Sequence, residues 1–362
     1  MWWDRFLDPL RGRAITIPPL DGGLRPNTAL EAAPVVAAVP HPAALAVAGG
    51  RLLVATGNEV REIGPGGEVQ MSEVVFGFGR PVSALAGLGD GGFAASLEDG
   101  TIAFCGGRHD GLTLAGIGPD RLACPTALAE VPDGSGHLLV TQGAPGKAPA
   151  DWVADLMEHG ASGSLWRLDP ASGEAQCLAG GLAWPAGVLP LADGGAIVAE
   201  SWRHRLVRVA AGRAPAPVLE KLPAYPGRLV SLASGGALMA LFAPRNRLVE
   251  LVLQEHGYRR AMMAEVPRPL WIAPALDPPA SFLEPLQCGG VRTMGVFKPW
   301  APSRSCGLVV ELDATFRPLR SWHSRADGRR HGIVDVAVHG SRAVAASRGG
   351  DAVVVLEAEE RP

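Results

Sequence analysis

Six residues with binding or reactive side chains occupy equivalent positions in a repeated sequence pattern. Each lies directly before a proline, or in one case a glycine, that opens a short apolar run: His41, Arg80, Cys124, Trp184, Tyr225 and His331. Imidazole is well suited to acid and base catalysis near neutral pH, so we expect His331 and His41 to be catalytic. The other four supply a cation, a thiol and two aromatic rings, and are predicted to bind a flat or anionic organic substrate.

The elements that must position these residues follow from the repeat. Each copy has a turn, an apolar run, a second turn and a second apolar run. The copies are anchored at Pro42, Pro81, Pro125, Pro185, Pro226 and Gly332. Most are spaced by roughly forty residues, the period of a propeller blade, and blades pack into a ring because one small sheet cannot bury both faces. The pattern predicts an all-β fold, a six-bladed β-propeller with four-stranded blades starting near residues 40, 80, 124, 184, 225 and 331.

The composition favours the same fold class. The chain of 362 residues contains 47 glycines and 32 prolines and is 47% hydrophobic, which favours many short strands over long helices. A net charge of -3 without basic runs argues against a nucleic-acid partner. The five cysteines show no C-x-x-C spacing, which indicates a reducing compartment rather than a disulfide framework or a zinc site.

The chain is expected to form one propeller over residues 31–362, preceded by an N-terminal extension over residues 1–30. Two long spacings mark insertions: a short helix is predicted within residues 143–163, and a Pro-rich lid or strap within residues 266–306. The N-terminus carries Asp4 and Asp8 where a signal peptide needs an unbroken apolar stretch, and no run of about 18 apolar residues predicts a membrane span. We therefore expect a cytoplasmic protein.

Three segments carry a family resemblance. "DLMEHGASGSLWRLDP", "AESWRHR" and "APRN" resemble the strictosidine synthase-like family of six-bladed propellers, over about Asp151 to Glu357. The first three blades match by repeat pattern alone. Relatives include calcium-dependent lactonases and esterases of the gluconolactonase and paraoxonase kind, and plant enzymes that condense an amine with an aldehyde without a metal. The resemblance implies a site at the mouth of the axial channel and leaves these chemistries open.

The residues just after the anchoring positions bear on the metal. In the hydrolase relatives, the resemblance implies, four blades place an acidic residue or asparagine there, or beside it, to bind calcium. This chain has Ala43, Val82, Thr126, Ala186, Gly227 and Ile333 at those places. None of them is a carboxylate or an amide, and calcium needs about six to eight oxygen ligands. We therefore expect no metal site and no cofactor.

The condensing relatives place a catalytic glutamate two residues after a histidine in the last blade. Aligning that histidine with His331 puts Ile333 on the glutamate, so the principal base is missing. A shifted register would offer Asp335 as the base instead. A Cys124 thiolate nucleophile is a further alternative, although the sequence supplies no certain base for it.

Two other motifs carry charged residues that we interpret as structural. Glu200 ends an apolar run in "AESWRHR", where a carboxylate usually accepts hydrogen bonds from backbone or from arginines such as Arg203. His204 belongs to the same motif. Arg245 and Asn246 in "APRN" resemble a clamp on a turn.

Three functional hypotheses remain open. The leading one is a metal-independent enzyme that acts on a carbonyl, amine or ester-like small molecule at the axial channel, with His41 and His331 brought together where the last blade closes on the first. The first alternative is a non-catalytic small-molecule-binding or assembly protein with a decayed active site. The second is a hydrolase of the lactonase or esterase type.

Overall fold

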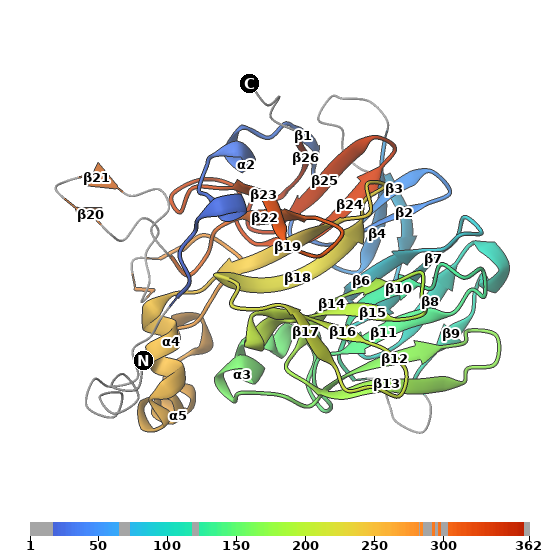
Figure 1. Cartoon of the computed structure of the whole chain (residues 1–362), viewed down its shortest axis with the longest axis horizontal. Coiled ribbons are helices and arrows are strands. Elements are labelled where there is room, and N and C mark those ends of the chain that lie inside the picture. The colour runs from blue at the N-terminus through green and yellow to red at the C-terminus, as the bar shows by residue number, and fades with distance from the viewer. Residues whose placement is uncertain are drawn as a thin grey trace.

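Six four-stranded antiparallel sheets follow one another around a ring, which makes the protein a six-bladed β-propeller (Figure 1). The computed structural model describes residues 17–64, 73–117, 123–281, 283–284, 292–293, 296–297 and 303–357. Most of the N-terminal extension, including its two tryptophans, lies outside the described residues. The predicted fold class is therefore confirmed, with few and short helices among the strands.

Each blade is named here by its order along the chain. Blades 1 and 2 consist of β2 (Pro42–Ala48), β3 (Arg51–Thr56), β4 (Glu59–Ile63) and β5 (Glu73–Gly77), then β6 (Val82–Gly87), β7 (Phe93–Leu97), β8 (Ile102–Cys105) and β9 (Thr113–Leu114). Blades 3 and 4 consist of β10 (Pro125–Glu130), β11 (Leu138–Gln142), β12 (Gly163–Leu168) and β13 (Ala175–Leu182), then β14 (Pro185–Pro190), β15 (Ala196–Glu200), β16 (Arg205–Val209) and β17 (Ala216–Leu219). Blades 5 and 6 consist of β18 (Ala224–Ser231), β19 (Ala237–Pro244), β22 (Leu308–Leu312) and β23 (Pro318–His323), then β24 (Ile333–His339), β25 (Arg342–Ser347), β26 (Ala352–Leu356) and β1 (Val35–Ala38).

The second strands of the blades are buried on both faces. Every residue of β7, β11 and β15 is buried, because neighbouring blades cover both sides of each sheet. Such strands are near-continuous apolar runs rather than alternating ones. This explains why the second apolar run of each copy is visible in the sequence.

The ring is closed by a strand from the N-terminal end. β1 pairs with β26, so the last blade takes its outer strand from residues that precede the first blade. The innermost strand of blade 6, β24, lies against that of blade 1, β2. Closure in this way removes the free sheet edges that an open row of blades would leave.

A β-bulge interrupts the innermost strand of every blade, at or just after the anchoring residue. The register skips one residue on five of these strands and two on β18. The skipped residues are Ala43, Ser83, Thr126, Ala186, Gly227 with Arg228, and Val334. A bulge leaves its extra residue unpaired and re-aims its side chain, so these residues are released from the sheets.

Helices gather where the chain leaves the blades. η3 (Pro149–Asp151) and α3 (Trp152–Met157) lie between β11 and β12, while α4 (Arg247–Gln254), α5 (His256–Glu265) and η5 (Arg268–Leu270) follow β19. α3, α4 and α5 share one apolar cluster and lie on the same side of the ring (Figure 1). Three short 3-10 turns, one short α-helix and a small hairpin complete the described elements: η1 (Gly22–Leu24), η2 (Gly107–His109) and η4 (Ser201–Arg203), α2 (Ala29–Ala32), and β20 (Arg292–Thr293) with β21 (Val296–Phe297). Within the described ranges, no helix is long and apolar enough to cross a membrane.

Candidate functional site

An axial cavity of about 270 Å³ lies where the six bulges converge. Every blade contributes its bulge to the lining: Ala43, Ser83, Thr126, Ala186, Gly227 with Arg228, and Val334. Of the six residues that directly follow the anchoring positions, five line the cavity: Ala43, Val82, Thr126, Ala186 and Gly227. In blade 6 the bulge moves the lining position from Ile333, which is fully buried, to Val334.

Both insertions cover part of this cavity. Pro149, Ala150 and Trp152 reach it from the first insertion, and Leu276 reaches it from the second. The second segment lies very close to blade 6, since a Cβ atom added at Gly332 would lie 2.2 Å from the carbonyl oxygen of Leu276. The left-handed backbone of Gly332, with φ of 56°, also favours glycine there.

One wall of the cavity is aromatic. Trp152, Trp184 and Phe242 line it, and Trp202 lies behind them, stacked on Trp184 with ring centroids 5.4 Å apart. The Trp202 indole Nε1–H donates a 2.8 Å hydrogen bond to Asp155, which fixes the ring. Rigid aromatic surfaces of this kind bind flat apolar parts of small molecules at low entropic cost.

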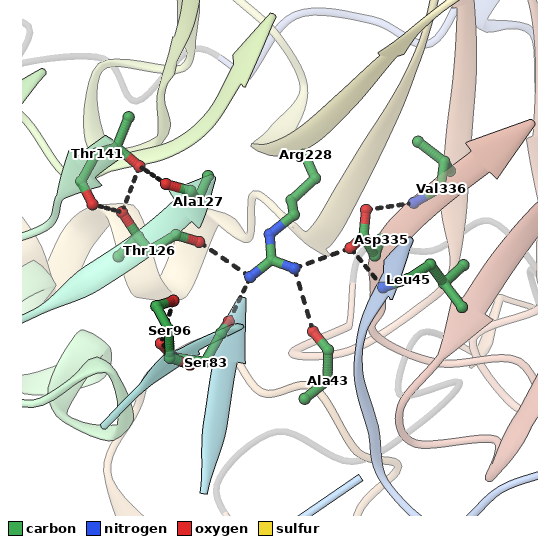
Figure 2. A network of polar contacts seen from close by, with 10 residues as sticks. All are labelled: Ala43, Leu45, Ser83, Ser96, Thr126, Ala127, Thr141, Arg228, Asp335 and Val336. Carbon is green, nitrogen blue, oxygen red and sulfur yellow. Dashed lines mark hydrogen bonds and ion pairs between the residues drawn. The ribbon is translucent and has the colours of Figure 1, made fainter. Parts of the chain in front are cut away.

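The floor of the cavity contains a guanidinium group. Arg228 leaves the bulge of β18 and reaches toward the other blades (Figure 2). Its Nη2 donates to the carbonyl oxygens of Ser83 and of Thr126, the latter at 2.9 Å, and its Nη1 donates to Ala43 at 3.5 Å. These three carbonyls belong to bulge residues, whose ladder pairing is interrupted, so the arginine supplies donors that the sheets do not.

Asp335 is the counter-charge of Arg228. Nη1 of Arg228 lies 2.8 Å from Oδ2 of Asp335, which also accepts from the backbone N–H of Leu45 at 2.8 Å. Oδ1 accepts from the N–H of Val336. Burial raises the pKa of Asp335, while Arg228 and these N–H donors oppose the rise. The shifted register that would make Asp335 a base therefore meets a carboxylate already committed to an ion pair.

The donor set at the axis does not fit the calcium site that the sequence resemblance implies. Among the described residues, no three His, Cys, Asp or Glu side chains are grouped closely enough to hold a metal ion. The oxygens that face the axis from Ala43, Ser83, Thr126 and Asp335 are instead bound by the Arg228 guanidinium. Calcium would need six to eight oxygens and would face a fixed positive charge.

A carboxyl group and a second arginine complete the polar lining. Glu98 follows β7 and Arg348 follows β25, and both line the cavity. Burial raises the pKa of Glu98 above its ordinary value of 4.5, and Asp151 adds to the rise while Arg348 opposes it. A carboxyl group with a raised pKa beside a cavity is suited to proton transfer.

The two predicted catalytic histidines lie elsewhere. His331 is fully buried, with Nδ1 3.0 Å from Ser305 Oγ and Nε2 3.2 Å from the Gly328 carbonyl. His41 is exposed, in a left-handed turn with φ of 44°, and its Nδ1 lies 3.6 Å from Asp277. Neither is among the described residues that line the axial cavity.

Of the four predicted substrate-binding residues, one lines the axial cavity and three lie elsewhere. Trp184 lines the cavity, as expected for a wall residue. Arg80 is exposed at the turn before blade 2. Cys124 packs behind Trp184, and burial raises the pKa of its thiol to about 12, which disfavours a thiolate. Tyr225 is fully buried behind Phe242, with ring centroids 5.8 Å apart.

The charged motifs interpreted as structural make hydrogen bonds within the protein, one in blade 4 and the other at the start of α4. Glu200 is completely buried and accepts hydrogen bonds from Arg203 and Arg205, and also from the N–H of Ala183. Arg245 forms a two-pronged ion pair with Glu250 of α4. The Asn246 side chain caps the N-terminus of α4 by accepting from the Leu248 N–H.

Sequence reasoning did not single out Arg228, Glu98 or Ser83. Ser83 and Arg228 each directly follow a position that the repeat marked, whereas Glu98 follows β7 and lies far from any of those positions. The available signal was Arg228 itself, a charged residue between Gly227 and the apolar run of β18. A charge inside an otherwise buried inner strand requires a partner across the axis.

The fold and the cavity define a six-bladed propeller with a small-molecule-sized axial site. No protein-family model matches the sequence, and no functionally curated protein matches it significantly. Among solved structures, a gluconolactonase from Xanthomonas campestris has a TM-score of 0.54 at 12% identity, over 95% of this chain and 99% of that one. A luciferin-regenerating enzyme has a TM-score of 0.48 at 12% identity, over 87% and 86%. The first similarity supports the propeller fold; the strictosidine synthase-like resemblance stays a prediction.

Proposed function

We propose that the protein is a metal-independent hydrolase of lactone or ester-like small molecules, acting in the axial cavity. The observation that carries this proposal is that Glu98, with its raised pKa, shares one cavity with two arginines and an aromatic wall. A base, fixed positive charge and an apolar surface are the groups that acyl hydrolysis needs. The cavity volume of about 270 Å³ suits a ligand of metabolite size.

The roles of the residues follow from their charges. The Glu98 carboxylate takes a proton from water as the water oxygen attacks the substrate carbonyl carbon. The negative charge that develops on the carbonyl oxygen is stabilised by the field of Arg348 and Arg228. The tetrahedral intermediate then collapses, the bond to the alkoxy oxygen breaks, and the proton returns from Glu98 to that oxygen. A lactone thus yields a hydroxy acid, with water as the only co-reactant.

The similarity to the Xanthomonas campestris structure favours hydrolysis over an amine condensation. The Xanthomonas campestris protein is described as a gluconolactonase, and it supports a hydrolase-type reaction by analogy of fold. In this proposal Trp184 keeps its predicted role as substrate wall. The predicted catalytic role passes from His331 and His41 to Glu98, because Glu98 is the carboxyl group among the described residues that line the cavity.

A binding protein without catalysis is the second candidate. The observation that favours it is that Arg228 already uses four hydrogen bonds to protein acceptors and is neutralised by Asp335. A guanidinium that is so fully committed stabilises a new oxyanion less than a free one does.

A turnover assay distinguishes the hydrolase from the non-catalytic binding protein. Purified protein is incubated with a panel of γ- and δ-lactones and aryl esters in the presence of a chelator, and acid release is followed. We expect hydrolysis that Glu98→Gln reduces by 10²-fold or more, while substrate affinity remains. Glu73→Gln, an exposed carboxylate on β5, is the matched control and should leave turnover unchanged. Saturable ligand binding without any turnover would favour the binding protein and contradict the hydrolase.

A further inference from the structure

The axis of the propeller is bridged by one side chain. Arg228 belongs to blade 5 and donates hydrogen bonds to residues of four other blades (Figure 2). The acceptors are the carbonyl oxygens of Ala43 in blade 1, Ser83 in blade 2 and Thr126 in blade 3, and the carboxylate of Asp335 in blade 6. A single guanidinium therefore links five of the six blades.

The geometry points to a specific role: we propose that the Arg228 guanidinium is the resident cation of the channel, which takes the oxygen acceptors of the axis and so replaces a divalent ion. This inference does not depend on the hydrolase proposal. It assigns both a structural role, closure of the ring at its centre, and a binding property, exclusion of divalent cations.

The acceptors have the chemistry of a cation site. Three are backbone carbonyls released by bulges, and the fourth is a carboxylate held by the Leu45 and Val336 N–H groups. Carbonyl and carboxylate oxygens are the ligands that hard cations prefer. In this chain a planar fork of N–H donors meets them, and such a fork can satisfy several acceptors at once.

Neighbouring polar groups reinforce the arrangement. The Thr126 hydroxyl lies 2.9 Å from the Thr141 hydroxyl and 2.5 Å from the Pro185 carbonyl, which ties blade 3 to blade 4. Blade 4 is the one blade that Arg228 does not reach directly through these bonds. The polar contacts at the axis therefore extend around the whole ring.

Thermal unfolding of the wild type and of Arg228→Ala, with and without calcium, tests the proposal. For the wild type, millimolar calcium or a chelator should shift the Tm by less than about 1 °C, because no ligand that binds the native state is gained or lost. Arg228→Ala should lower the Tm by roughly 4–7 °C, because it leaves the Asp335 carboxylate without its counter-charge and three carbonyls without their donor. Arg348→Ala removes an arginine from the same cavity and is the matched control, with a shift of less than about 2 °C.

Chemical rescue identifies the guanidinium as the active group. Millimolar ethylguanidinium, which reproduces the deleted atoms, should restore part of the Tm of Arg228→Ala but not change that of the wild type. Sodium chloride and urea at equal concentration should give no such recovery. Rescue by calcium in Arg228→Ala alone would also support a cation site at the axis.

A second pair of variants covers failure of Arg228→Ala to fold. Arg228→Lys keeps the positive charge but removes the planar fork of N–H donors. Its Tm should decrease by about half of the decrease expected for Arg228→Ala. The double variant Arg228→Met/Asp335→Leu removes both charges, yet should stay well below the wild type because the bulge carbonyls remain unpaired. Wild-type stability in that double variant, or calcium stabilisation of the wild type, would overturn the proposal.

Discussion

Nη1 of Arg228 and Oδ2 of Asp335 lie 2.8 Å apart, and join the innermost strands of blades 5 and 6 by a buried ion pair. The Asp335 side chain is almost fully buried and that of Arg228 is about 13% exposed. Removing one partner of a buried pair leaves an uncompensated charge in a poorly solvated place. The fold should therefore lose stability when either partner of this pair is removed.

Asp335→Ala should lower the free energy of unfolding by about 3–5 kcal/mol, because it leaves the Arg228 charge and the Leu45 N–H without their acceptor. Denaturant titration followed by circular dichroism measures this change. Asp193→Ala breaks an exposed ion pair with Arg208 and is the control, expected to cost less than about 1 kcal/mol. An equal decrease in the free energy of unfolding in the two variants would mean that the axial ion pair stabilises the fold no more than an exposed one.

The acid limb of the pH–rate profile should report Glu98. Because burial raises the pKa of its carboxyl group, the group is protonated, and inactive as a base, up to a pH above its ordinary 4.5. Catalytic efficiency, kcat/KM, should therefore fall as the pH decreases through that raised pKa. Arg348→Gln removes the charge that opposes the rise, so the acid limb should move to higher pH. A profile that is flat down to pH 4 would exclude Glu98 as the base.

The ring of blades could be predicted from the sequence because its signal is local and repeated. Turn residues and apolar runs recur in each blade, and apart from β1 in blade 6 each sheet forms from strands that follow one another along the chain. Helix α4 could not be predicted in the same way, because it occurs once and is not part of the repeat. The sequence through Leu248 and Leu251 is apolar like the second run of each copy, but Asn246 caps a helix there that buries Val249, Val252 and Leu253. A short apolar run does not distinguish strand from helix by itself.

The cavity lining was predicted only in part because a bulge changes which residue leaves the strand. In blade 2 the bulge selects Ser83 instead of Val82 for the unpaired position, and in blade 6 it selects Val334 instead of Ile333. No local signal in the sequence fixes the register at that level. Long-range polar pairing, such as that of Arg228 with Asp335, is equally invisible until the blades are placed around the axis.

Trp184→Ala should weaken substrate binding more than it slows turnover. The indole forms part of the aromatic wall and stacks on Trp202. Loss of this surface should raise KM about tenfold with a smaller change in kcat. Trp184→Phe keeps an aromatic ring and should lie between the wild type and the alanine variant. Tyr258→Ala, an exposed position on α5, is the control; a loss of kcat alone in Trp184→Ala would contradict a wall role.

His331→Ala should reduce stability and leave turnover per folded molecule unchanged. A carbonyl can only accept, so Nε2–H donates to Gly328 and Nδ1 accepts from the Ser305 hydroxyl. Loss of both bonds and of the ring volume should cost about 2–4 kcal/mol. Differential scanning calorimetry and active-site-normalised rates measure the two effects. Abolished turnover at unchanged Tm would instead restore His331 to the catalytic role that the sequence predicted.

Three buried histidines should make the protein sensitive to mild acid. Burial lowers the pKa of His204 to about 3 and that of His323 to about 4, and also lowers that of His331. In the unfolded chain these imidazoles take up protons below about pH 6.5, while in the folded protein they stay neutral.

Stability is therefore fully present above pH 6.5 and is lost as the pH falls toward 4, by about 3 kcal/mol for His323 alone. The Tm measured by calorimetry should therefore decrease as the pH is lowered from 6.5 to 4.5, and should change little between pH 8 and 6.5. His323→Gln keeps a polar group beside Ser321 and should flatten the curve, whereas His41→Gln, at an exposed position, should leave it unchanged. An unchanged slope in His323→Gln would mean that other groups, such as paired carboxylates, control the acid response.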